Sequence, residues 1–544
     1  MHGGRLSRLL ACATALGLVV VGCGGTDSGD EGGGGGDNSY SIAIGEPDSL
    51  IPGNDNEEDG LTVIYATFDG LVRYDPDTGE PINNVAKSIE TKDQQTWTIT
   101  LKQGRTFHNG EEVTAKNFVW AWNYAAYGPH AFVNNYFFGN IKGYDALNPE
   151  DPDGDGPKEA PKPETKKMSG LKVVDKYTFK VTLKYPFSQF PLTLGYAAFM
   201  PLPKVAFKDM EAFNEHPIGN GPYKMATDWK HNEAIKLTAY EDYKGPRKPQ
   251  AKTINLKIYT NLSTAYTDLL GGEVDILTTI PAAKVPNAKQ QFGDRFISQP
   301  SSTMDYLSFP MYMEKYQRQK VRWAISMAIN RKAITENIFS GTFTPMNSLL
   351  PPIIPGYREN ACGKHCEFHP DKAKQLLKEA GGWEGTMYLW FNGSPTNRRW
   401  MKAVRNMLKE NLGIESIKFR QVSDAEYLTK LANHEANGPA RKNWYMDYPS
   451  PQNYLQPQFS SEGSSNRNGY SNPKVDKLIL KGNSASSKQA ARKYYHKAED
   501  LILKDMPITP LWNWREQAAY SENVTNVTID PYSGLHAWQV KPTG

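Results

Sequence analysis

Two cysteines and two histidines near residue 365 have side chains that can either form a disulfide or bind a metal ion. Cys362, His365, Cys366 and His369 give the pattern C-x2-H-C-x2-H within eight residues. Thiolate and imidazole groups are the usual ligands of a tetrahedral zinc site, but so compact a site needs a tight local fold. In an oxidising compartment, two cysteines this close in sequence typically form a disulfide that closes a small loop. The pattern therefore favours a Cys362–Cys366 disulfide, with zinc binding as the alternative.

A second group of potential ligands lies in a polar surface segment, residues 148–166. Asp151-x-Asp153-x-Asp155-Gly156 matches the start of a calcium-binding loop, in which alternate carboxylates bind the ion. The twelfth position of such a loop requires a bidentate Glu, and here it is Lys162. A solvated Asp-Gly turn is the better interpretation, so we expect no metal and no cofactor.

The common catalytic motifs are absent from the sequence. It contains no G-x-S-x-G, H-E-x-x-H or G-x-x-x-x-G-K-[ST] pattern. His434-Glu435 is followed by Ala-Asn-Gly, so the zinc-protease pattern is not completed. The sequence predicts that the protein is not an enzyme, with a secreted hydrolase as the alternative.

The N-terminal region has the features of an export signal. Arg5 and Arg8 precede an uncharged apolar stretch, residues 9–21, as in a secretory signal peptide. Thirteen helical residues extend about 20 Å, less than the roughly 30 Å hydrocarbon core of a membrane, so we expect cleavage rather than a transmembrane helix. Val20-Val21-Gly22-Cys23 resembles the bacterial lipobox, in which the cysteine is lipidated and becomes the new N-terminus. An ordinary signal peptide with an incidental cysteine is the alternative.

A polar linker follows this cysteine. Residues 24–38 are rich in Gly, Asp, Ser and Glu, and residues 32–36 are all glycine. Such a composition behaves as a flexible coil, with a reach of about 20 Å. A diacylglycerol group on Cys23 would anchor the chain stably, because two acyl chains bind a membrane far better than one. We therefore expect a lipid-anchored protein at the extracellular face of the cytoplasmic membrane.

Length and charge restrict the remaining possibilities. Removing the first 22 of 544 residues leaves 522, more than one hydrophobic core usually organises, so two or three domains are expected. Loss of Arg5 and Arg8 lowers the formal net charge from +3 to +1. Because the charges are interspersed along the sequence, it indicates neither nucleic acid nor an anionic membrane surface as a partner.

Several segments have the periodicity of helices or strands, the elements that must position the candidate functional residues. Residues 97–101 alternate in polarity as a half-buried strand does. Amphipathic helices are predicted over residues 113–124, 321–338, 370–380 and 494–503. Strands and helices mixed in this way predict an α/β or α+β fold, and no fixed-period repeat argues for a solenoid or propeller.

Several segments, taken together, resemble one protein family. The most specific are FHNGEEVTAKN, residues 107–117, and HPIGNGPY, residues 216–223, where Asn220 replaces the usual Thr. The set is similar to the extracellular solute-binding proteins of ABC importers, family 5, which include oligopeptide and dipeptide binders. The matches run in family order; the other segments are residues 46–52, 85–88, 97–104, 272–276, 321–331, 444–449, 470–473 and 507–511.

The resemblance implies a mixed α/β (α+β) fold with two lobes, the type II periplasmic-binding-protein or Venus-flytrap arrangement. Such lobes close around a ligand by a hinge motion. We expect a monomer that delivers its solute to the permease subunits of an ABC importer. The implied division is a signal peptide (1–22), a lipidated linker (23–38), a discontinuous lobe I (39–80, 210–308 and 515–544) enlarged by an extra domain (81–209), and lobe II (309–514).

Asp447 is the residue to which the resemblance assigns the ammonium group of a peptide ligand. An ionised carboxylate suits this task, because charge-assisted hydrogen bonds are about twice as strong as neutral ones. Asn443 and Tyr445 match positions whose main chain pairs with an extended ligand, as in strand addition. Trp444 either contacts the ligand or belongs to the core. The alternative for Asp447 is a structural residue before a Tyr-Pro turn.

Further residues of the expected site come from the ligand's other end and from the opposite lobe. Arg441 matches a basic residue that receives the ligand carboxylate, for which a planar guanidinium is suited. Arg398 and Arg399 are the alternatives for this role. Asn54 and Asp55 lie in the segment by which the opposite lobe is expected to contact the ligand.

The sequence thus predicts a lipoprotein that captures extracellular oligopeptides for import. A nickel chelate or an oligosaccharide is the alternative solute. Asp447 favours an amine-bearing ligand, whereas a sugar site relies on stacked aromatic rings and neutral polar groups. A receptor for a peptide signal would use the same binding chemistry, so the sequence does not separate nutrient uptake from signalling.

Overall fold

A computed structural model describes residues 38–149, 161–532 and 534–543. The proposed signal peptide, Cys23, most of the linker and the Asp-rich motif of residues 151–156 lie outside these residues. Among the described residues, no helix is long and apolar enough to cross a membrane.

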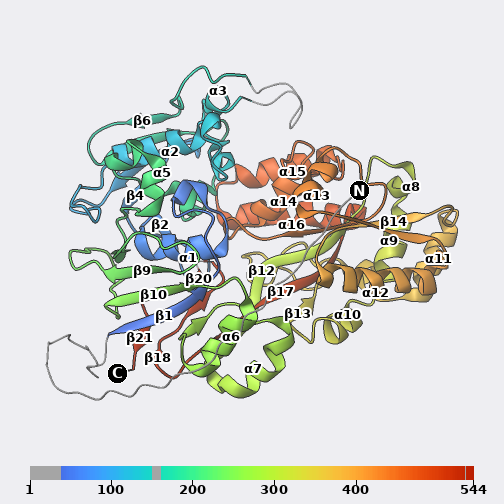
Figure 1. The fold of residues 1–544 in the computed structure, drawn as a ribbon. Coiled ribbons are helices and arrows are strands. Elements are labelled where there is room, and N and C mark those ends of the chain that lie inside the picture. The colour runs from blue at the N-terminus through green and yellow to red at the C-terminus, as the bar shows by residue number, and fades with distance from the viewer. Residues whose placement is uncertain (1–37, 150–160, 533, 544) are drawn as a thin grey trace, which may run out of the picture. The chain divides into compact units, whose positions relative to one another are not determined.

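Eleven strands form one mixed sheet (Figure 1). They are Ser39–Ile44 (β1), Tyr223–Met225 (β8), Ala234–Ala239 (β9), Thr253–Ile258 (β10), Ile276–Leu277 (β11), Phe296–Ser308 (β12), Phe343–Pro345 (β13), Met387–Asn392 (β14), Ile417–Val422 (β15), Ala440–Trp444 (β16) and Ile508–Tyr520 (β17). Their order is β15-β14-β16-β12-β17-β11-β1-β10-β9-β8, and β13 pairs with β17 outside this path. Parallel pairs such as β1–β10 and β14–β15 occur beside antiparallel pairs such as β12–β17.

The long strands β12 and β17 connect the two halves of this sheet. Each has 13 residues, and their pairing is interrupted between Pro300 and Met304. Beyond one end of the pair, β11 continues the sheet from Tyr520 of β17. Beyond the other end, β16 pairs with Met304–Ser308 of β12. Two groups of strands are therefore joined by one strand pair, which changes register where it passes from one group to the other.

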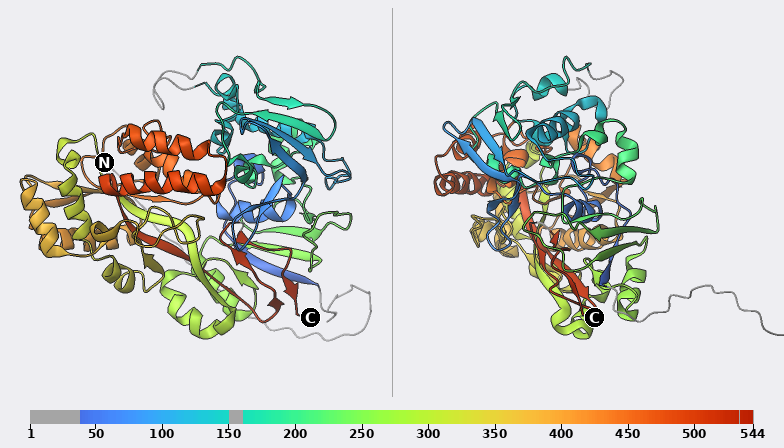
Figure 2. Two further views of the ribbon diagram at one scale, coloured as in Figure 1. Left: turned by 180° about the vertical axis from the view of Figure 1, so that it is seen from behind. Right: turned by 90° about the vertical axis from the view of Figure 1, so that its left-hand side faces the viewer.

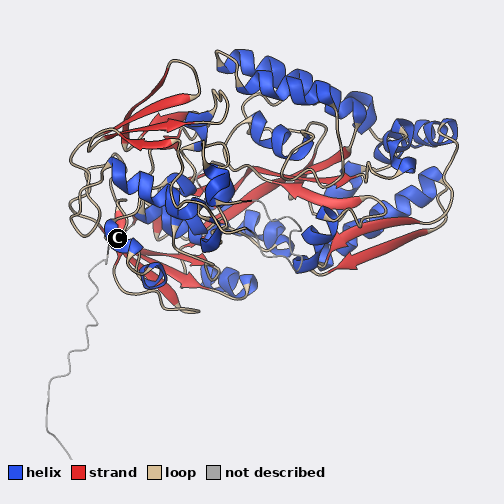
Figure 3. Ribbon diagram, turned by 90° about the horizontal axis from the view of Figure 1, so that it is seen from above, coloured by secondary structure: helices blue, strands red, loops and turns tan. Residues whose placement is uncertain are grey.

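Helices cover both faces of the half that contains β14. Figure 3 shows the helices that pack around the strands. Met387, Leu389 and Phe391 of β14 belong to one large buried cluster, whereas Trp390 belongs to a second cluster on the other face. This double coverage is typical of parallel strands in α/β proteins. The helices of this half are Glu314–Gln317 (α8), Gln319–Met327 (α9), Arg331–Asn337 (α10), Pro370–Glu379 (α11), Pro395–Leu412 (α12), Asp424–Ala432 (α13), Pro451–Phe459 (α14), Pro473–Asn483 (α15) and Lys488–Asp505 (α16).

The single helix predicted over residues 321–338 is wrong, because the structure divides it into α9 and α10. The side chain of Asn330 accepts a hydrogen bond from the Ala333 N–H and so begins a new helix. The buried Arg331 guanidinium, at the start of α10, donates to the carbonyl oxygens of Ser326 and Pro510. The helix predicted over residues 370–380 is confirmed by α11, and that over 494–503 is part of the longer α16.

A separate four-stranded antiparallel sheet packs against helix α2. Its strands, in the order β4-β5-β7-β6, confirm the strand predicted over residues 97–101, and α2 confirms the helix over 113–124. Thr114 precedes α2, and its N–H and hydroxyl group both donate to Oδ1 of Asn117. Trp122 packs edge-on against Phe179 with 5.5 Å between ring centroids. The elements are Ala86–Thr91 (β4), Thr96–Leu101 (β5), Leu171–Val173 (β6), Thr178–Thr182 (β7) and Ala115–Ala126 (α2).

The remaining helices and short strand pairs lie outside these two sheets (Figure 2). Among the helices are Glu58–Thr67 (α1), Tyr144–Leu147 (α3), Phe190–Thr193 (α4), Met210–Glu215 (α5), Leu262–Gly271 (α6) and Val285–Phe292 (α7). Three two-stranded ribbons pair Val72–Tyr74 (β2) with Pro81–Asn83 (β3), Val524–Thr525 (β18) with Lys541–Pro542 (β21), and Ile529–Asp530 (β19) with Gly534–Leu535 (β20). The 3-10 helices are Pro52–Asn54 (η1), Gly128–His130 (η2), Asn135–Phe138 (η3), Ala197–Phe199 (η4), Lys204–Phe207 (η5), Ala282–Lys284 (η6), Gly293–Arg295 (η7) and Gly363–Cys366 (η8).

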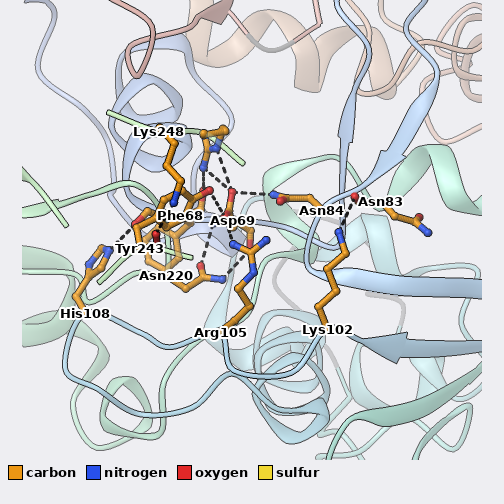
Figure 4. A network of polar contacts seen from close by, with 12 residues as sticks. Phe68, Asp69, Asn83, Asn84, Lys102, Arg105, His108, Asn220, Tyr243 and Lys248 are labelled. Carbon is orange, nitrogen blue, oxygen red and sulfur yellow. Dashed lines mark hydrogen bonds and ion pairs between the residues drawn. The ribbon is translucent and has the colours of Figure 1, made fainter. Parts of the chain in front are cut away.

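A buried polar network around Asp69 joins segments that are distant in sequence (Figure 4). The Asp69 carboxylate accepts hydrogen bonds from the side chains of Asn84, Tyr243 and Arg247, each at 2.7 Å at its shortest. Asn220 bonds to the Asp69 main chain in both directions. Asn220 therefore connects its own turn to a segment 151 residues earlier in the chain.

Candidate ligand-binding site

Asp447 lies in the turn between β16 and helix α14, where Asn453 holds it in a fixed orientation. The Asp447 N–H donates to Asn453 Oδ1 at 2.9 Å, and Asn453 Nδ2 donates to Asp447 Oδ2 at 2.7 Å. Asn453 is only 1% exposed and lies on the first turn of α14, which Ser450 caps. Because Asn453 engages only Oδ2, the other carboxylate oxygen is left to face different partners.

Tyr136 is the partner of that second oxygen. Its hydroxyl group donates to Asp447 Oδ1 at 3.1 Å, although the two residues are 311 positions apart. Tyr136 belongs to η3 and is 49% exposed. Its ring stacks on Phe137 at 4.6 Å, and Phe137 stacks on Tyr196 at 4.4 Å. A stack of aromatic rings therefore positions the hydroxyl group.

Aromatic side chains enclose Asp447 on other sides. Tyr448 is 8% exposed and clusters with Tyr74 and Leu192, which come from the first 200 residues of the chain. Its hydroxyl group hydrogen-bonds to the side chain of Gln452. Tyr445, in contrast, is 46% exposed, so its ring is available to a ligand.

These surroundings change the acidity of Asp447. Burial raises the pKa of its carboxyl group from 3.8 to about 6, while the hydrogen bonds from Asn453 and Tyr136 act in the opposite direction. A carboxylate has about four lone-pair positions for hydrogen bonds, and these two bonds leave others unused. The group can therefore accept hydrogen bonds from an incoming cation, and a positive charge beside it would restore its ordinary acidity.

The main chain of β16 offers an unpaired edge beside Asp447. The Pro439 carbonyl accepts the Trp390 N–H, and the Arg441 carbonyl accepts the Tyr427 hydroxyl group. Both carbonyls point away from β12, and main-chain groups along a strand alternate between its two sides. Asn443 therefore points in the same direction as Arg441, whereas Tyr445 lies beyond the last residue of the strand. Within the described strands β14 pairs with β16 at Ala440 alone, and the Tyr427 hydroxyl group occupies the Arg441 carbonyl, so the edge is open from Asn443 onward.

Arg441 is already engaged by a buried acid. Its Nη2 donates to Oδ1 of Asp305 at 2.9 Å, and the two side chains are 11% and 4% exposed. Asp305 also accepts the indole N–H groups of Trp512 and Trp514 at 3.0 and 2.7 Å. This pairing offsets much of the positive charge of Arg441. A ligand carboxylate at this position would have to share the guanidinium with Asp305.

Trp444 packs against the large buried cluster of the β14 half. Its ring contacts that cluster and is partly buried. Its indole Nε1 is buried and has no hydrogen-bond partner within the part of the chain that the structure describes. The packing supports the core role that the sequence left open, and the unpaired donor leaves the ligand role open as well.

Asn54 and Asp55 lie at the end of η1 and differ in their surroundings. Asn54 Oδ1 accepts the N–H of Val133, three residues before Tyr136. Asp55 is 1% exposed and accepts the N–H groups of Ser49 and Glu57. Burial, together with the neighbouring Glu57, raises the pKa of Asp55 to about 8. Asn54 is thus linked to the segment that carries Tyr136, whereas the Asp55 carboxyl group is turned into its own loop.

Cys362 and Cys366 form a disulfide, with 1.93 Å between the sulfur atoms. The nearby histidines have other contacts: His365 stacks on Trp323 at 4.0 Å, and His369 Nε2 is 3.0 Å from Glu367. Among the described residues, no group of three or more His, Cys, Asp and Glu side chains is arranged to hold a metal ion.

Three residues that shape the candidate site were not among those predicted from the sequence: Asn453, Asp305 and Tyr136. Asn453 carries a recognisable local signal, because Ser450-Pro451 is a typical helix start and places it on the first turn. Asp305 and Tyr136 have no such signal, since their partners are 136 and 311 residues away. A cavity of about 70 Å³ lies elsewhere, beside the Asp69 network, and includes none of the predicted site residues.

Comparison with known proteins identifies the family. The model of "Bacterial extracellular solute-binding proteins, family 5 Middle" matches residues 80–466. The chain belongs to this family. The family is one of extracellular solute-binding proteins. The solved structures that the chain resembles confirm the mixed α/β, two-lobed fold predicted from the sequence.

Curated relatives cover nearly the whole chain. The oligopeptide-binding protein OppA of Bacillus subtilis is 27% identical, with 94% of each chain covered. The dipeptide-binding protein DppE of the same organism is 24% identical, with 97% of each covered. The glutathione-binding protein GsiB of Salmonella paratyphi A is 27% identical, with 90% of this chain and 91% of the relative covered. These relatives are substrate-binding proteins rather than enzymes.

Solved structures share the fold at lower identity. The murein tripeptide-binding protein MppA, in its unliganded open form, gives a TM-score of 0.79 at 23% identity, covering 93% of this chain and 98% of MppA. Haemophilus influenzae OppA in complex with the peptide RPPGFSPFR gives 0.73 at 22% identity, covering 94% of this chain and all of that chain.

Proposed function

We propose that this protein captures oligopeptides between its two lobes and delivers them to the permease of an ABC importer. The observation that carries this proposal is the half-buried Asp447 carboxylate, oriented by Asn453 and with acceptor capacity left for a cation. The peptide ammonium would bind there. The division into lobe I, its extra domain and lobe II at the boundaries predicted from the sequence is part of the same proposal.

The open edge of β16 supports an extended ligand. From an ammonium bound at Asp447, a peptide main chain would run beside Tyr445 and then along Asn443, whose main-chain groups face the unpaired side. Strand addition of this kind draws affinity from the constant backbone and leaves side chains to pockets. The names of OppA and DppE, an oligopeptide- and a dipeptide-binding protein, point to the same ligand class.

Calorimetry with Asp447→Asn tests the assignment. The substitution keeps the shape of the side chain but removes the charge, so the affinity for a peptide should fall by about 2–5 kcal/mol if the carboxylate pairs a buried ammonium. Asp294→Asn makes the same change at an exposed carboxylate of η7 and should leave the affinity unchanged.

Chemical variation of the ligand separates the alternatives. A peptide with an acetylated N-terminus lacks the ammonium and should bind the unaltered protein as weakly as the free peptide binds Asp447→Asn. Equal affinity of acetylated and free peptides would refute the role of Asp447. Tight binding of a nickel chelate or an oligosaccharide, insensitive to Asp447→Asn, would favour a different solute.

We further propose that Cys23 carries a lipid that tethers the protein outside the cytoplasmic membrane. The support is the lipobox-like sequence before Cys23 and the extracellular family to which the chain belongs. A receptor held near its permease works at high effective concentration. Cys23→Ala should release the protein from cells into the medium; a variant that stays in the membrane fraction would contradict the tether.

A further inference from the structure

Helix α12 carries a row of basic side chains along one face. Arg398, Lys402, Arg405 and Lys409 are spaced by four, three and four residues, which places them above one another on a helix. Arg398, Lys402 and Lys409 are exposed, and Arg405 is half-buried. The apolar residues of α12, such as Met401 and Val404, instead enter the large buried cluster.

Side chains of strand β15 bound this row on one side. Arg398 donates to the side chain of Gln421, and the Arg405 guanidinium lies 4.9 Å from the centre of the Phe419 ring, so the row on α12 borders β15. Lys418 and Arg420 alternate with these residues and point to the opposite face of the sheet, where the Arg420 guanidinium lies 4.6 Å from the centre of the Tyr388 ring. We therefore restrict the name basic ridge to helix α12; its members are Arg398, Arg399, Lys402, Arg405 and Lys409.

The charge of the basic ridge is not neutralised locally. Residues 395–412 contain five basic side chains and one acidic side chain, whereas the entire chain has a formal net charge of only +3. Within the described part of the chain, no ridge residue forms an ion pair with an acid. Helix α12 therefore carries a local concentration of positive charge.

The chemistry of the ridge differs from that of a protein-binding surface. Protein interfaces usually contain a buried apolar or aromatic centre. The exposed large hydrophobic side chains of the described residues include none between residues 395 and 422. A charged edge strand also prevents strands of other chains from pairing with it, which explains Lys418 and Arg420. It does not explain the row on α12, which is not part of the strand.

We propose that the basic ridge binds the headgroups of anionic lipids. Each Lys or Arg near an anionic membrane contributes attraction that falls off within a Debye length, without requiring apolar contact. This interaction is independent of peptide capture and of a lipid on Cys23. It would press the β14 half of the protein against the membrane and so restrict how the tethered body turns. The small net charge of the whole chain masks this local concentration of positive charge.

Sedimentation with lipid vesicles tests this proposal. The buried hydrophobic clusters of the described residues lie between Tyr40 and Val540, so a chain that begins at residue 38 contains all of them and can be used without a lipid anchor. Its partition onto phosphatidylcholine vesicles should rise with the fraction of phosphatidylglycerol and fall with added salt.

A matched pair of double variants localises the effect. Lys402→Gln/Lys409→Gln removes two exposed ridge charges, and partition onto anionic vesicles should fall by about fivefold for each lysine. Lys172→Gln/Lys180→Gln removes two exposed lysines that face each other across β6 and β7, and it should have little effect. Peptide affinity should be unchanged in both. Equal loss in the two variants, or no preference for anionic vesicles, would overturn the proposal.

Discussion

Asp447 illustrates how one carboxylate is prepared for a cation. Burial among Tyr136, Tyr448 and their neighbours raises its pKa to about 6. Two hydrogen bonds with Asn453, one from the Asp447 N–H and one to Asp447 Oδ2, hold the carboxylate in a fixed orientation. In the proposed site, an incoming ammonium would replace the lost hydration and stabilise the ionised form. Burial thus destabilises the ionised carboxylate in the absence of ligand, and a bound cation would remove this destabilisation.

The affinity for peptide should therefore depend on pH in a defined direction. The pKa of free Asp447 is raised to about 6 and a bound ammonium lowers it, so protons compete with the ligand as the pH falls through 6. We expect constant affinity near pH 7 and a loss approaching about tenfold per pH unit below pH 6. Above about pH 8 the affinity should fall again, because the peptide amine loses its proton.

Titration calorimetry between pH 4.5 and 9 measures this profile. Asp447→Asn should abolish the acid limb and retain the alkaline limb only weakly, since the substituted side chain does not titrate. An acid limb that persists unchanged in Asp447→Asn would assign the titration to another group, such as Glu58 or Glu516, whose pKa values burial raises to about 7.

The elements of the fold could be predicted where the pattern was local. The strand β5 and helices α2 and α11 follow from alternation, capping and apolar periodicity over a dozen residues or fewer. The break between α9 and α10 was missed although Asn330 is a typical N-cap residue, because the apolar face continues across it. The bond from the buried Arg331 to the Pro510 carbonyl, 179 residues away, has no signal in the local sequence.

Strand β16 leads to a prediction about the ligand's main chain. If a peptide pairs with the open edge at Asn443 and Tyr445, its own N–H groups must point alternately toward β16 and away from it. Methylating one peptide nitrogen at a time should weaken binding by about 1–3 kcal/mol at alternate positions and much less between them. Competition binding with the methylated series measures this. A uniform effect at all positions would contradict strand pairing.

The Cys362–Cys366 disulfide closes a loop of only a few residues, a separation of four. The chain-entropy relation predicts a small stabilisation for so short a loop, about 2 kcal/mol. Cys362→Ala/Cys366→Ala should lower the free energy of unfolding in urea by this amount and leave peptide affinity unchanged. Zinc should not stabilise the reduced protein; stabilisation by zinc and its reversal by a chelator would favour the metal alternative instead.

Contacts between distant segments of the chain shape the candidate binding site, and they were the least predictable from the sequence. Asp447 was named from a motif, but its partner Tyr136 lies 311 residues earlier. The assignment of Arg441 to the ligand carboxylate stays a prediction, and its pairing with Asp305 weighs against it. The basic ridge, by contrast, is local, since its charges lie within residues 398–409 of one helix, α12.

In the proposed function, hinge closure is the motion that joins these parts. β12 and β17 are the strands that pass between the two groups of the sheet, and their pairing is irregular between Pro300 and Met304. The bond between Tyr136 and Asp447 already connects a segment from each side of the site. A ligand that competes for Asp447 therefore acts on a contact between distant parts of the chain as well as on a local pocket.

Native mass spectrometry of the protein isolated from its own cells examines the bound solute without choosing it in advance. We predict a series of complexes whose extra masses, after release and sequencing, are peptides with free N-termini, and which are depleted in Asp447→Asn. A single extra mass corresponding to a nickel chelate or an oligosaccharide, retained in Asp447→Asn, would contradict capture of peptides through their ammonium group.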